Sequence, residues 1–348
     1  MENYYYSTLS PAMDIGAGVY LLFITILSVM GNVLVLVTAF KRSSRMKPPE
    51  LLSVNLAVTD LGAAVTMYPL AVASAWSHHW LGGDITCVYY GLAGFFFGVA
   101  SIMNLMLLAI VRFIVSLNLQ SPKGKLGWRH VKLMCLWSWF YALLWALLPI
   151  LGVGRYGPEP FGLSCTLAWG HMRHEDFSFV IAMFFFNLAL PTTVIVCCYF
   201  GITIKLYVTY KKSFNHTQRL TKTIKLHRRL LTIAILISLG FIGCWSPYGL
   251  VSLWSIFRDS SSIPPEVSLL PCMFAKSSTV YNPIIYYVFS KSFKQEVKQL
   301  ICSCPAFSNP CKVNNSINDN SVYTANMVDK QATEEEATYL GSRAASLV

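Results

Sequence analysis

The chain has 348 residues, of which 55% are hydrophobic and only 12% are charged. A soluble globular domain carries about twice that fraction of charged residues, so the composition excludes an ordinary soluble fold. The net charge of +11 is compatible with nucleic-acid binding, but the basic residues lie in alternate loops between apolar runs. That distribution is typical of membrane proteins and argues against a nucleic-acid partner.

Seven apolar runs are long enough to cross a bilayer as helices, which need about 20 residues each. They cover residues 19–40, 51–76, 87–116, 131–151, 177–210, 227–257 and 267–289. We therefore predict an all-α membrane protein whose seven-helix transmembrane bundle occupies residues 17–289. We expect no cleavable signal peptide, because the first residues are polar and tyrosine-rich instead of basic and then apolar.

The loops that follow the first, third and fifth apolar runs are basic, and the opposite loops are poor in cations. The basic loops carry Lys41, Arg42, Arg45 and Lys47, then Lys123, Lys125 and Arg129, then Lys211, Lys212, Arg219, Lys222, Lys225, Arg228 and Arg229. Cytoplasmic loops of membrane proteins carry this excess of Lys and Arg. We therefore expect a multi-pass protein of the plasma membrane, with residues 1–16 extracellular and the C-terminus in the cytoplasm.

Residues 290–302 follow the last apolar run and predict a short amphipathic helix. Phe293, Val297 and Leu300 fall on one face of that helix, and three lysines accompany them. A helix of this kind lies in the membrane interface.

The end of the predicted interfacial helix carries Cys302 and Cys304, which are candidates for palmitoylation. The alternative is that both remain free cytosolic thiols. Residues 303–348 form a polar tail that we expect to be disordered, and Ser346–Val348 at its end match a ligand of PDZ domains. The ten cysteines include no CxxC pair and no metal-ligand spacing, so we predict no metal site.

Lys276 lies near the middle of the last apolar run, and its nearest charged neighbours along the chain are Glu266 and Lys291. A lysine at mid-membrane costs ~3 kcal/mol on insertion scales, so its presence implies a function. Snorkelling to the membrane surface is the alternative, but the middle of a helix is far from that surface. A desolvated amine is suited to condensing with a carbonyl group to form a Schiff base.

Motifs in order along residues 17–300 resemble those of the opsins, the light-sensing members of the rhodopsin-like G-protein-coupled receptors. They are Gly31 and Asn32, Asn55 with Asp60, Cys87, Arg112, Trp139, Cys165, Pro191, Tyr199, Cys244 to Pro247, and Asn282 with Pro283 and Tyr286. The resemblance to opsins in particular depends on Lys276, six residues before the Asn-Pro motif. The last two apolar runs are similar to those of the non-visual, neuropsin-like group.

The resemblance implies that Lys276 holds retinal, 11-cis or all-trans, as a protonated Schiff base. The buried positive nitrogen then needs an anion. Tyr90 stands where vertebrate visual opsins carry a glutamate, so Glu159, in the second outer loop, is the expected counterion. A pair at ~4 Å with an effective dielectric constant of ~20 is attracted by ~4 kcal/mol. The alternative is a solvated loop glutamate.

Cys87 and Cys165 match the disulfide of the family, and they are the only two cysteines that we place on the oxidising, extracellular side of the membrane. This bond would tie the second outer loop over the retinal pocket.

The pocket should be apolar and aromatic. By position, it comprises Gly94, Phe95, Gly98, Trp169, Met183, Phe184, Phe241, Trp245, Tyr248 and Cys272. Taken singly, an aromatic residue at helical spacing is more often plain core. Trp245 and Tyr248 are stronger candidates for the pocket than the other aromatic residues, because they lie beside Pro247, which fixes their place in the motif and supplies a hinge.

The resemblance also assigns residues to activation and to G-protein contact. They are Asp60, Ser101, Arg112, Tyr199, Asn282, Pro283 and Tyr286. The sequence departs from the family at Val111, where an acidic residue normally precedes the arginine, and at His227, where the sixth run normally offers a second acid. Because Arg112 lacks both carboxylates, we expect activity in the dark or altered coupling.

The predicted function is therefore light sensing. Isomerisation of retinal shifts the bundle to a state that activates a heterotrimeric G protein, and arrestin and a receptor kinase are further partners at the C-terminal tail. One alternative is a retinal photoisomerase with weak or no G-protein coupling. Another is a receptor for a diffusible ligand, in which Lys276 is accidental. We expect no catalytic residues, and we find no inverted repeat that would indicate a transporter.

Overall fold

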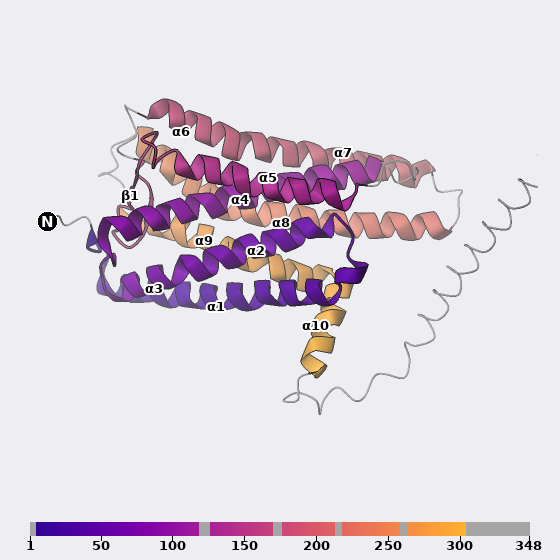
Figure 1. Cartoon of the computed structure of the whole chain (residues 1–348), viewed down its shortest axis with the longest axis horizontal. Coiled ribbons are helices and arrows are strands. Elements are labelled where there is room, and N and C mark those ends of the chain that lie inside the picture. Colours follow the sequence, from indigo (N-terminus) through magenta and orange to yellow (C-terminus); the bar gives the residue numbers. More distant parts are fainter. Residues whose placement is uncertain (1–4, 118–125, 170–175, 213–217, 258–263, 304–348) are drawn as a thin grey trace, which may run out of the picture. The chain divides into compact units, whose positions relative to one another are not determined.

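Long helices run side by side and form a bundle in this computed structural model (Figure 1). They are α1 (Pro11–Lys41), α2 (Glu50–Thr66) with α3 (Tyr68–Trp76), α4 (Gly83–Leu117), α5 (Trp128–Leu147), α6 (Phe177–Phe184) with η3 (Phe185–Ala189) and α7 (Leu190–Lys212), α8 (Gln218–Phe257) and α9 (Pro265–Phe289). Since α2 continues into α3 and α6 continues through η3 into α7, the bundle has the seven predicted segments. Six of them are long and apolar enough to cross a membrane, and α9, which carries Lys276 and two internal prolines, completes the set.

The structure describes residues 5–117, 126–169, 176–212, 218–257 and 264–303. For residues 210, 212, 218–223, 291, 292 and 301–303 it describes the backbone alone. The predictions for Cys304, for the tail beyond it and for the basic loop residues Lys123 and Lys125 lie outside the described residues. The side chain of Cys302 also lies outside them.

Two helices begin earlier than the apolar runs predict. The first starts at Pro11, and not at residue 19, because Ser10 accepts a hydrogen bond from the backbone N–H of Met13 and Pro11 occupies the first turn. The sixth segment, α8, starts at Gln218. Its first turns are rich in lysine and arginine, which favour helix but do not appear in a search for apolar runs.

Two segments depart from a regular α-helix. The second is divided at Met67, because Pro69 in the first turn of α3 has no N–H to donate and its ring crowds the preceding turn. The fifth contains η3, a π-helical turn with wider hydrogen bonding than an α-helix. Turns of this kind are frequent at functional sites.

The centre of the bundle is α4, which packs against α2, α5, α7 and α8 and also against a β-hairpin. Leu105, Leu108 and Val111 on α4 are almost completely buried, together with Leu52 and Ile237 from neighbouring helices. Side chains of this kind stabilise the bundle through van der Waals packing, because in a membrane the alternative to burial is contact with lipid and not with water.

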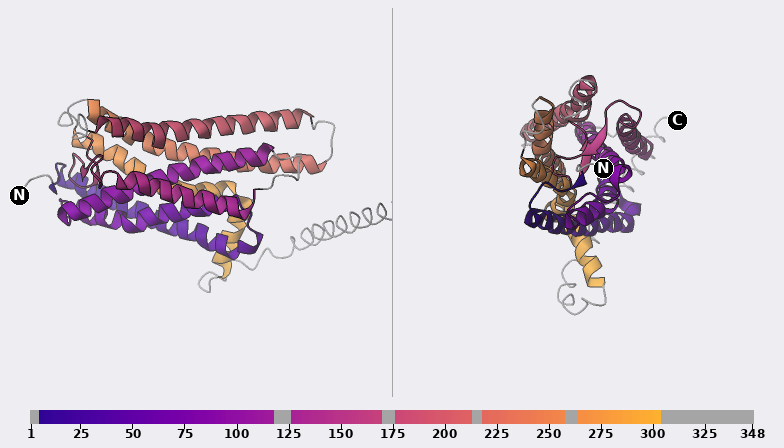
Figure 2. Two further views of the ribbon diagram at one scale, coloured as in Figure 1. Left: turned by 45° about the horizontal axis from the view of Figure 1, so that its top comes forward. Right: turned by 90° about the vertical axis from the view of Figure 1, so that its left-hand side faces the viewer.

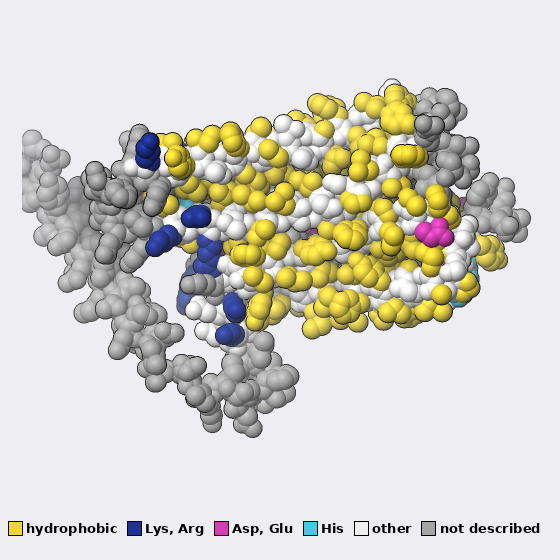
Figure 3. Space-filling model, turned by 180° about the vertical axis from the view of Figure 1, so that it is seen from behind, with side chains coloured by type: hydrophobic (Ala, Val, Ile, Leu, Met, Phe, Trp, Pro, Cys, Tyr) yellow, Lys and Arg dark blue, Asp and Glu magenta, His cyan; other side chains and the backbone are white. Residues whose placement is uncertain are grey.

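The outside of the bundle is apolar along its length, and basic side chains gather at one end (Figure 3). Phe40 is 83% exposed, and Phe200 and Leu250 are each 68% exposed. A soluble protein does not expose apolar side chains over so wide an area. This surface is suited to lipid, in agreement with a multi-pass membrane protein.

A short hairpin lies across the end of the bundle that is nearer the N-terminus (Figure 2). Its strands, β1 (Tyr156–Pro158) and β2 (Cys165–Leu167), are antiparallel, and Tyr156 pairs with Leu167. Between the strands, Gly162 has φ of +78°, and a Cβ there would lie 2.2 Å from the carbonyl oxygen of Tyr6. The position therefore requires glycine, and the N-terminal segment packs directly on the hairpin.

The predicted helix after the seventh segment is present as α10 (Lys291–Ser303). Phe293 is buried and packs edge-on against the ring of Tyr286, with 6.2 Å between the ring centroids. Lys294 places its Nζ 5.4 Å from the ring centroid of Tyr287. The location of α10 in the membrane interface stays a prediction.

Candidate functional site

A cavity of about 180 Å³ lies inside the bundle. All ten residues that the sequence predicted for the pocket line it: Gly94, Phe95, Gly98, Trp169, Met183, Phe184, Phe241, Trp245, Tyr248 and Cys272. Lys276, Glu159, Tyr90, Asp60 and Ser101 also line it. The structure therefore brings the predicted amine, acid and aromatic residues to one place.

The amine of Lys276 points into the bundle. Its Nζ donates to Sγ of Cys272, one turn earlier on α9, at 2.9 Å and lies 5.6 Å from the ring centroid of Tyr90. The backbone oxygen of Lys276 accepts a hydrogen bond from the hydroxyl of Tyr68 at 2.9 Å. The snorkelling alternative is therefore wrong, because the amine lines the cavity. No carboxylate oxygen in the described part of the chain lies within 4.0 Å of this amine.

Glu159 comes directly after β1, and its side chain is only 7% exposed. Its backbone N–H donates to the carbonyl of Ser164 at 2.8 Å, which fixes the residue within the hairpin. The Tyr248 hydroxyl donates to Oε1 of Glu159 at 2.8 Å and also lies 2.8 Å from Oγ1 of Thr166. Burial raises the pKa of the Glu159 carboxyl to about 7, while the hydrogen bond from Tyr248 and the charge of Lys276 act in the opposite direction. The acid is thus buried and held beside the cavity, and its role as counterion stays a proposal.

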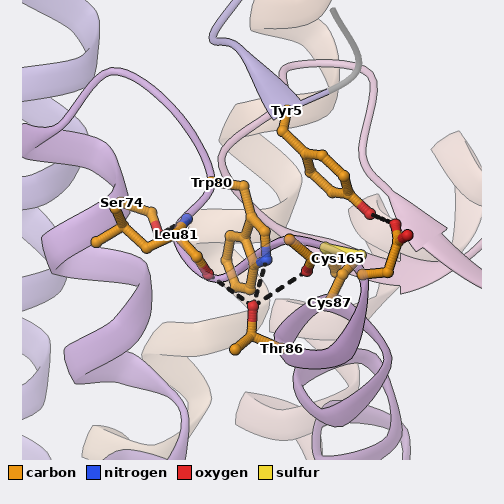
Figure 4. Close-up of a disulfide and its surroundings, with 9 residues drawn as sticks. Tyr5, Ser74, Trp80, Leu81, Thr86, Cys87 and Cys165 are labelled. Atoms are coloured by element: carbon orange, nitrogen blue, oxygen red, sulfur yellow. Dashed lines mark hydrogen bonds between the residues drawn. A yellow bond between two sulfur atoms is a disulfide. The ribbon is translucent and has the colours of Figure 1, made fainter. Parts of the chain in front are cut away.

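The predicted disulfide between Cys87 and Cys165 is confirmed, and it joins the start of α4 to β2 (Figure 4). Beside it, the Trp80 indole N–H donates to Oγ1 of Thr86 at 3.0 Å, and this hydroxyl lies 2.6 Å from the carbonyl of Leu81. These bonds fix the loop before α4. The hairpin that carries Glu159 is therefore anchored to the bundle by a covalent bond.

The ring of Trp245 forms part of the cavity wall. It stacks on Phe241 with 5.6 Å between the centroids, and its indole N–H donates to Oγ of Ser278 at 3.2 Å. On the facing helix, a Cβ at Gly98 would lie 3.1 Å from the Trp245 ring. Small residues on α4 therefore leave the room that the indole occupies.

Two residues that the sequence assigns to a polar core, Asp60 and Asn282, lie together in the structure. The side-chain amide of Asn282 donates to the carboxylate of Asp60 at 2.7 Å, and both residues are buried. Ser101 lines the same cavity as Asp60. Pro283 packs against α1, where a Cβ on Gly31 would lie 2.9 Å from its ring.

Arg112 lines a second cavity of about 140 Å³, together with Tyr286 and Glu50. Its Nε and the Tyr286 hydroxyl are buried without a hydrogen-bond partner in the described residues. No carboxylate in the same part of the chain lies within 4.0 Å of Arg112. The departure at Val111 thus leaves the guanidinium without an ion pair. His227, on α8, lies close enough to interact with it electrostatically.

Tyr199 faces α8, where its hydroxyl lies 3.0 Å from Oγ of Ser238 and donates to the carbonyl of Ala234 at 3.2 Å. Its hydroxyl therefore has partners on α8, whereas the Tyr286 hydroxyl has no hydrogen-bond partner among the residues that the structure describes. The supporting role predicted for both tyrosines stays a proposal.

Sequence reasoning missed several polar residues around the two cavities. They are Tyr68, Thr166, Asn187 and Ser278 at the first cavity and Glu50 at the second. Thr166 and Glu50 lie in or beside loops, where a polar residue gives no signal of its own. Asn187 interrupts an apolar run, and this interruption was the one available sign of function. Among the described residues no group of three metal-ligating side chains occurs.

Comparisons with known proteins agree with this geometry. The family described as 7 transmembrane receptor (rhodopsin family) matches residues 31–286. Opsin-5 of Mus musculus is 38% identical over 294 residues, which are 84% of this chain and 78% of the relative. Visual pigment-like receptor peropsin of Homo sapiens is 31% identical over 276 residues, 79% of this chain and 81% of the relative. The crystal structure of squid rhodopsin shares the fold with a TM-score of 0.78 at 27% identity, and the match covers 87% of this chain and 91% of that one. The chain therefore belongs to the rhodopsin family of seven-transmembrane receptors and, within it, to the non-visual opsins similar to Opsin-5.

Proposed function

We propose that this protein is a light-sensing receptor that binds retinal covalently on Lys276. The observation that carries the proposal is the position of the Lys276 amine, inside an apolar cavity and not at the lipid surface. The residues present fit a polyene, because aromatic side chains line the cavity and Gly94 faces it without a side chain. A Cβ at Gly94 would lie 2.9 Å from the terminal methyl of Met67. When bound, retinal supplies light absorption and a change of isomer.

Glu159 is the proposed counterion of the positively charged nitrogen. Tyr248 holds its carboxylate in place, and the hairpin and the disulfide hold its backbone. Tyr90 presents the face of an aromatic ring to the amine, which attracts a cation but carries no negative charge. Glu159, in the hairpin over the cavity, is therefore the acid that we propose to neutralise the nitrogen on Lys276.

The chain's own residues couple the cavity to the cytoplasmic side. Trp245 and Tyr248 lie on α8 on either side of Pro247, which removes a backbone hydrogen bond and permits bending there. If the shape of the cavity changes, the Trp245 ring favours another position. The equilibrium between two positions of α8 then shifts as well. The Asp60–Asn282 pair connects α2 to α9 below the cavity, and Arg112 is the proposed contact for a G protein.

The proposed orientation places the hairpin outside the cell and the basic loops in the cytoplasm of a plasma-membrane protein. Basic side chains gather at the end of the bundle that would face the G protein (Figure 3), and they suit an acidic protein surface. Arrestin, a receptor kinase and a PDZ protein remain proposed partners of the tail, which lies outside the described residues.

Borohydride trapping of retinal followed by peptide mapping tests the covalent site. The expected adduct lies on Lys276, and Lys276→Ala abolishes it. An absorption spectrum before and after illumination then tests light sensitivity, and light-dependent nucleotide exchange on a G protein tests signalling. Release of a retinal isomer in many turnovers without nucleotide exchange would favour a photoisomerase instead. Retinal trapped elsewhere, or not at all, would overturn the proposal.

A further inference from the structure

Asn187 is a buried amide with no partner. Its side chain is only 6% exposed, and neither its Nδ2 nor its Oδ1 makes a hydrogen bond within the described part of the chain. A buried polar group left unsatisfied costs roughly 1–3 kcal/mol. Because the side-chain amide has two such atoms, this position is unfavourable unless a further molecule supplies the missing hydrogen bonds.

The backbone places Asn187 at the wall of the cavity. Asn187 is the central residue of η3, the π-helical turn Phe185–Ala189, and its neighbours Phe185 and Phe186 are exposed on the lipid side. Asn187 itself lines the cavity of Lys276. The π turn thus lies in an apolar span at a residue that is polar and buried.

Asn187 and Lys276 belong to different walls of the cavity. Apart from its own segment, η3 packs chiefly against α4, whereas α9 packs chiefly against α1, α2 and α8. An elongated molecule fixed at one end to the Lys276 amine therefore has its other end available to the Asn187 wall. Between these two ends, the cavity is lined mainly by apolar and aromatic side chains, including Phe95, Phe184 and Phe241.

We propose that Asn187 is a binding subsite for an oxygen atom on the ring of the retinoid, so that this protein prefers a retinal with a ring hydroxyl or ring ketone. This inference rests on the proposed function. A side-chain amide has both donors and an acceptor, so it can satisfy either oxygen group. Unsubstituted retinal offers an apolar ring and leaves the amide unpaired. A site that is built to bind a polar group rejects the analogue that lacks it.

The test measures uptake of two aldehydes, retinal and ring-hydroxylated retinal, by the purified retinal-free protein. Uptake is measured in the dark by borohydride trapping at increasing aldehyde concentrations. The wild-type protein is expected to take up the hydroxylated aldehyde at about tenfold lower concentration, which corresponds to one hydrogen bond to a buried group. Asn187→Leu, which is similar in size but apolar, should lose this preference. Asn187→Thr, which retains a hydroxyl, should keep part of it.

The ratio between the uptake concentrations of the two aldehydes is measured in the wild-type protein alone. A folding defect in Asn187→Leu therefore leaves this part of the test intact. Equal uptake of both aldehydes by the wild-type protein would overturn the inference and assign the amide to a bound water. The same ratio in the wild type and in Asn187→Leu would overturn it as well. In either case, retinal trapped on Lys276 leaves the proposed function standing. If neither aldehyde forms an adduct, the proposed function and this inference both fall.

Discussion

The hydroxyl of Tyr248 donates a 2.8 Å hydrogen bond to the carboxylate of Glu159, and so connects α8 to the hairpin over the cavity. The carboxylate is therefore held in position by a residue of the bundle. Because Tyr248 lies on the helix that is expected to move, a displacement of α8 would also change the surroundings of the proposed counterion.

Glu159→Gln removes the negative charge but keeps the size of the side chain. In protein reconstituted with retinal, we expect the variant to absorb at shorter wavelength at neutral pH, because the nitrogen on Lys276 loses its proton at lower pH without the acid. The measurement is an absorption spectrum titrated with pH. Tyr248→Phe is the matched control, since it keeps the charge and removes the hydrogen bond, and it should shift the titration less. An unchanged spectrum in Glu159→Gln would remove Glu159 from the role.

The stability of the retinal-free protein should depend on pH through Glu159. Burial raises the pKa of this carboxyl to about 7 in the fold, so the folded state favours its protonated form. The resulting stabilisation is fully present below about pH 4.5 and is lost as the pH rises through about 7; its size is about 3 kcal/mol. Thermal midpoints in detergent should fall over that range in the wild type. Glu159→Gln should show a flatter profile, and an equally steep one would contradict the assignment.

The double variant Cys87→Ser with Cys165→Ser should be less stable and bind retinal poorly. The bond closes a loop with a sequence separation of 78 residues, and loop-closure entropy gives it about 4 kcal/mol of stabilisation. Without it, the hairpin with Glu159 is no longer anchored over the cavity. Thermal midpoints and retinal uptake measure the two effects. Cys197→Ser is the control, because Cys197 is exposed and free. The pair Cys244→Ser with Cys272→Ser is unsuitable, because Cys272 contacts Lys276.

Val111→Glu should lower activity in the dark. Arg112 has no carboxylate partner in the described structure, and Val111 is fully buried, so a carboxylate at position 111 would be stabilised chiefly by pairing with it. An ion pair of ~1 kcal/mol lowers the population of the active state by ~5-fold. A second-messenger assay in darkness, normalised to surface expression, measures this change. Val111→Gln is the uncharged control; equal dark activity in the wild type and Val111→Glu would rule out this explanation.

The photoproduct should be thermally stable and return to the dark form on a second illumination. The reason is that Tyr90, on α4, offers no carboxylate to the nitrogen on Lys276, and the acid lies in the hairpin instead. The measurement is a series of absorption spectra after alternating flashes of two colours. Rapid bleaching after one flash would contradict this prediction. Tyr90→Glu tests its cause, since it should change the lifetime of the photoproduct.

Much of the fold followed from the sequence, because apolar runs in a membrane protein report directly on its helices. All ten predicted pocket residues line one cavity, since motifs such as Cys244–Pro247 fix the register of each helix against a known family. The ends of α1 and α8 were less predictable. Ser10 and Pro11 start a helix by capping, and the basic start of α8 is helical without being apolar.

The contacts between distant polar residues could not be predicted. The bond from Tyr248 to Glu159 joins residues that are 89 positions apart, and it depends on where the hairpin lies over the bundle. The shared cavity of Glu50 and Arg112 likewise depends on how α2 packs beside α4. Periodicity describes one helix at a time, so it says nothing about which loop side chain reaches which helix.

The π turn at Phe185–Ala189 has a consequence for comparing this chain with its relatives. A π turn accommodates one residue more than a regular turn, so side chains on its two flanks differ in rotation by about 100° from a continuous α-helix. An alignment without a gap, made against a relative whose fifth helix is regular, would therefore match Phe186 or Leu188 to the inward position that Asn187 occupies here. Pocket residues on this helix have to be matched by superposing structures rather than by counting back from Pro191.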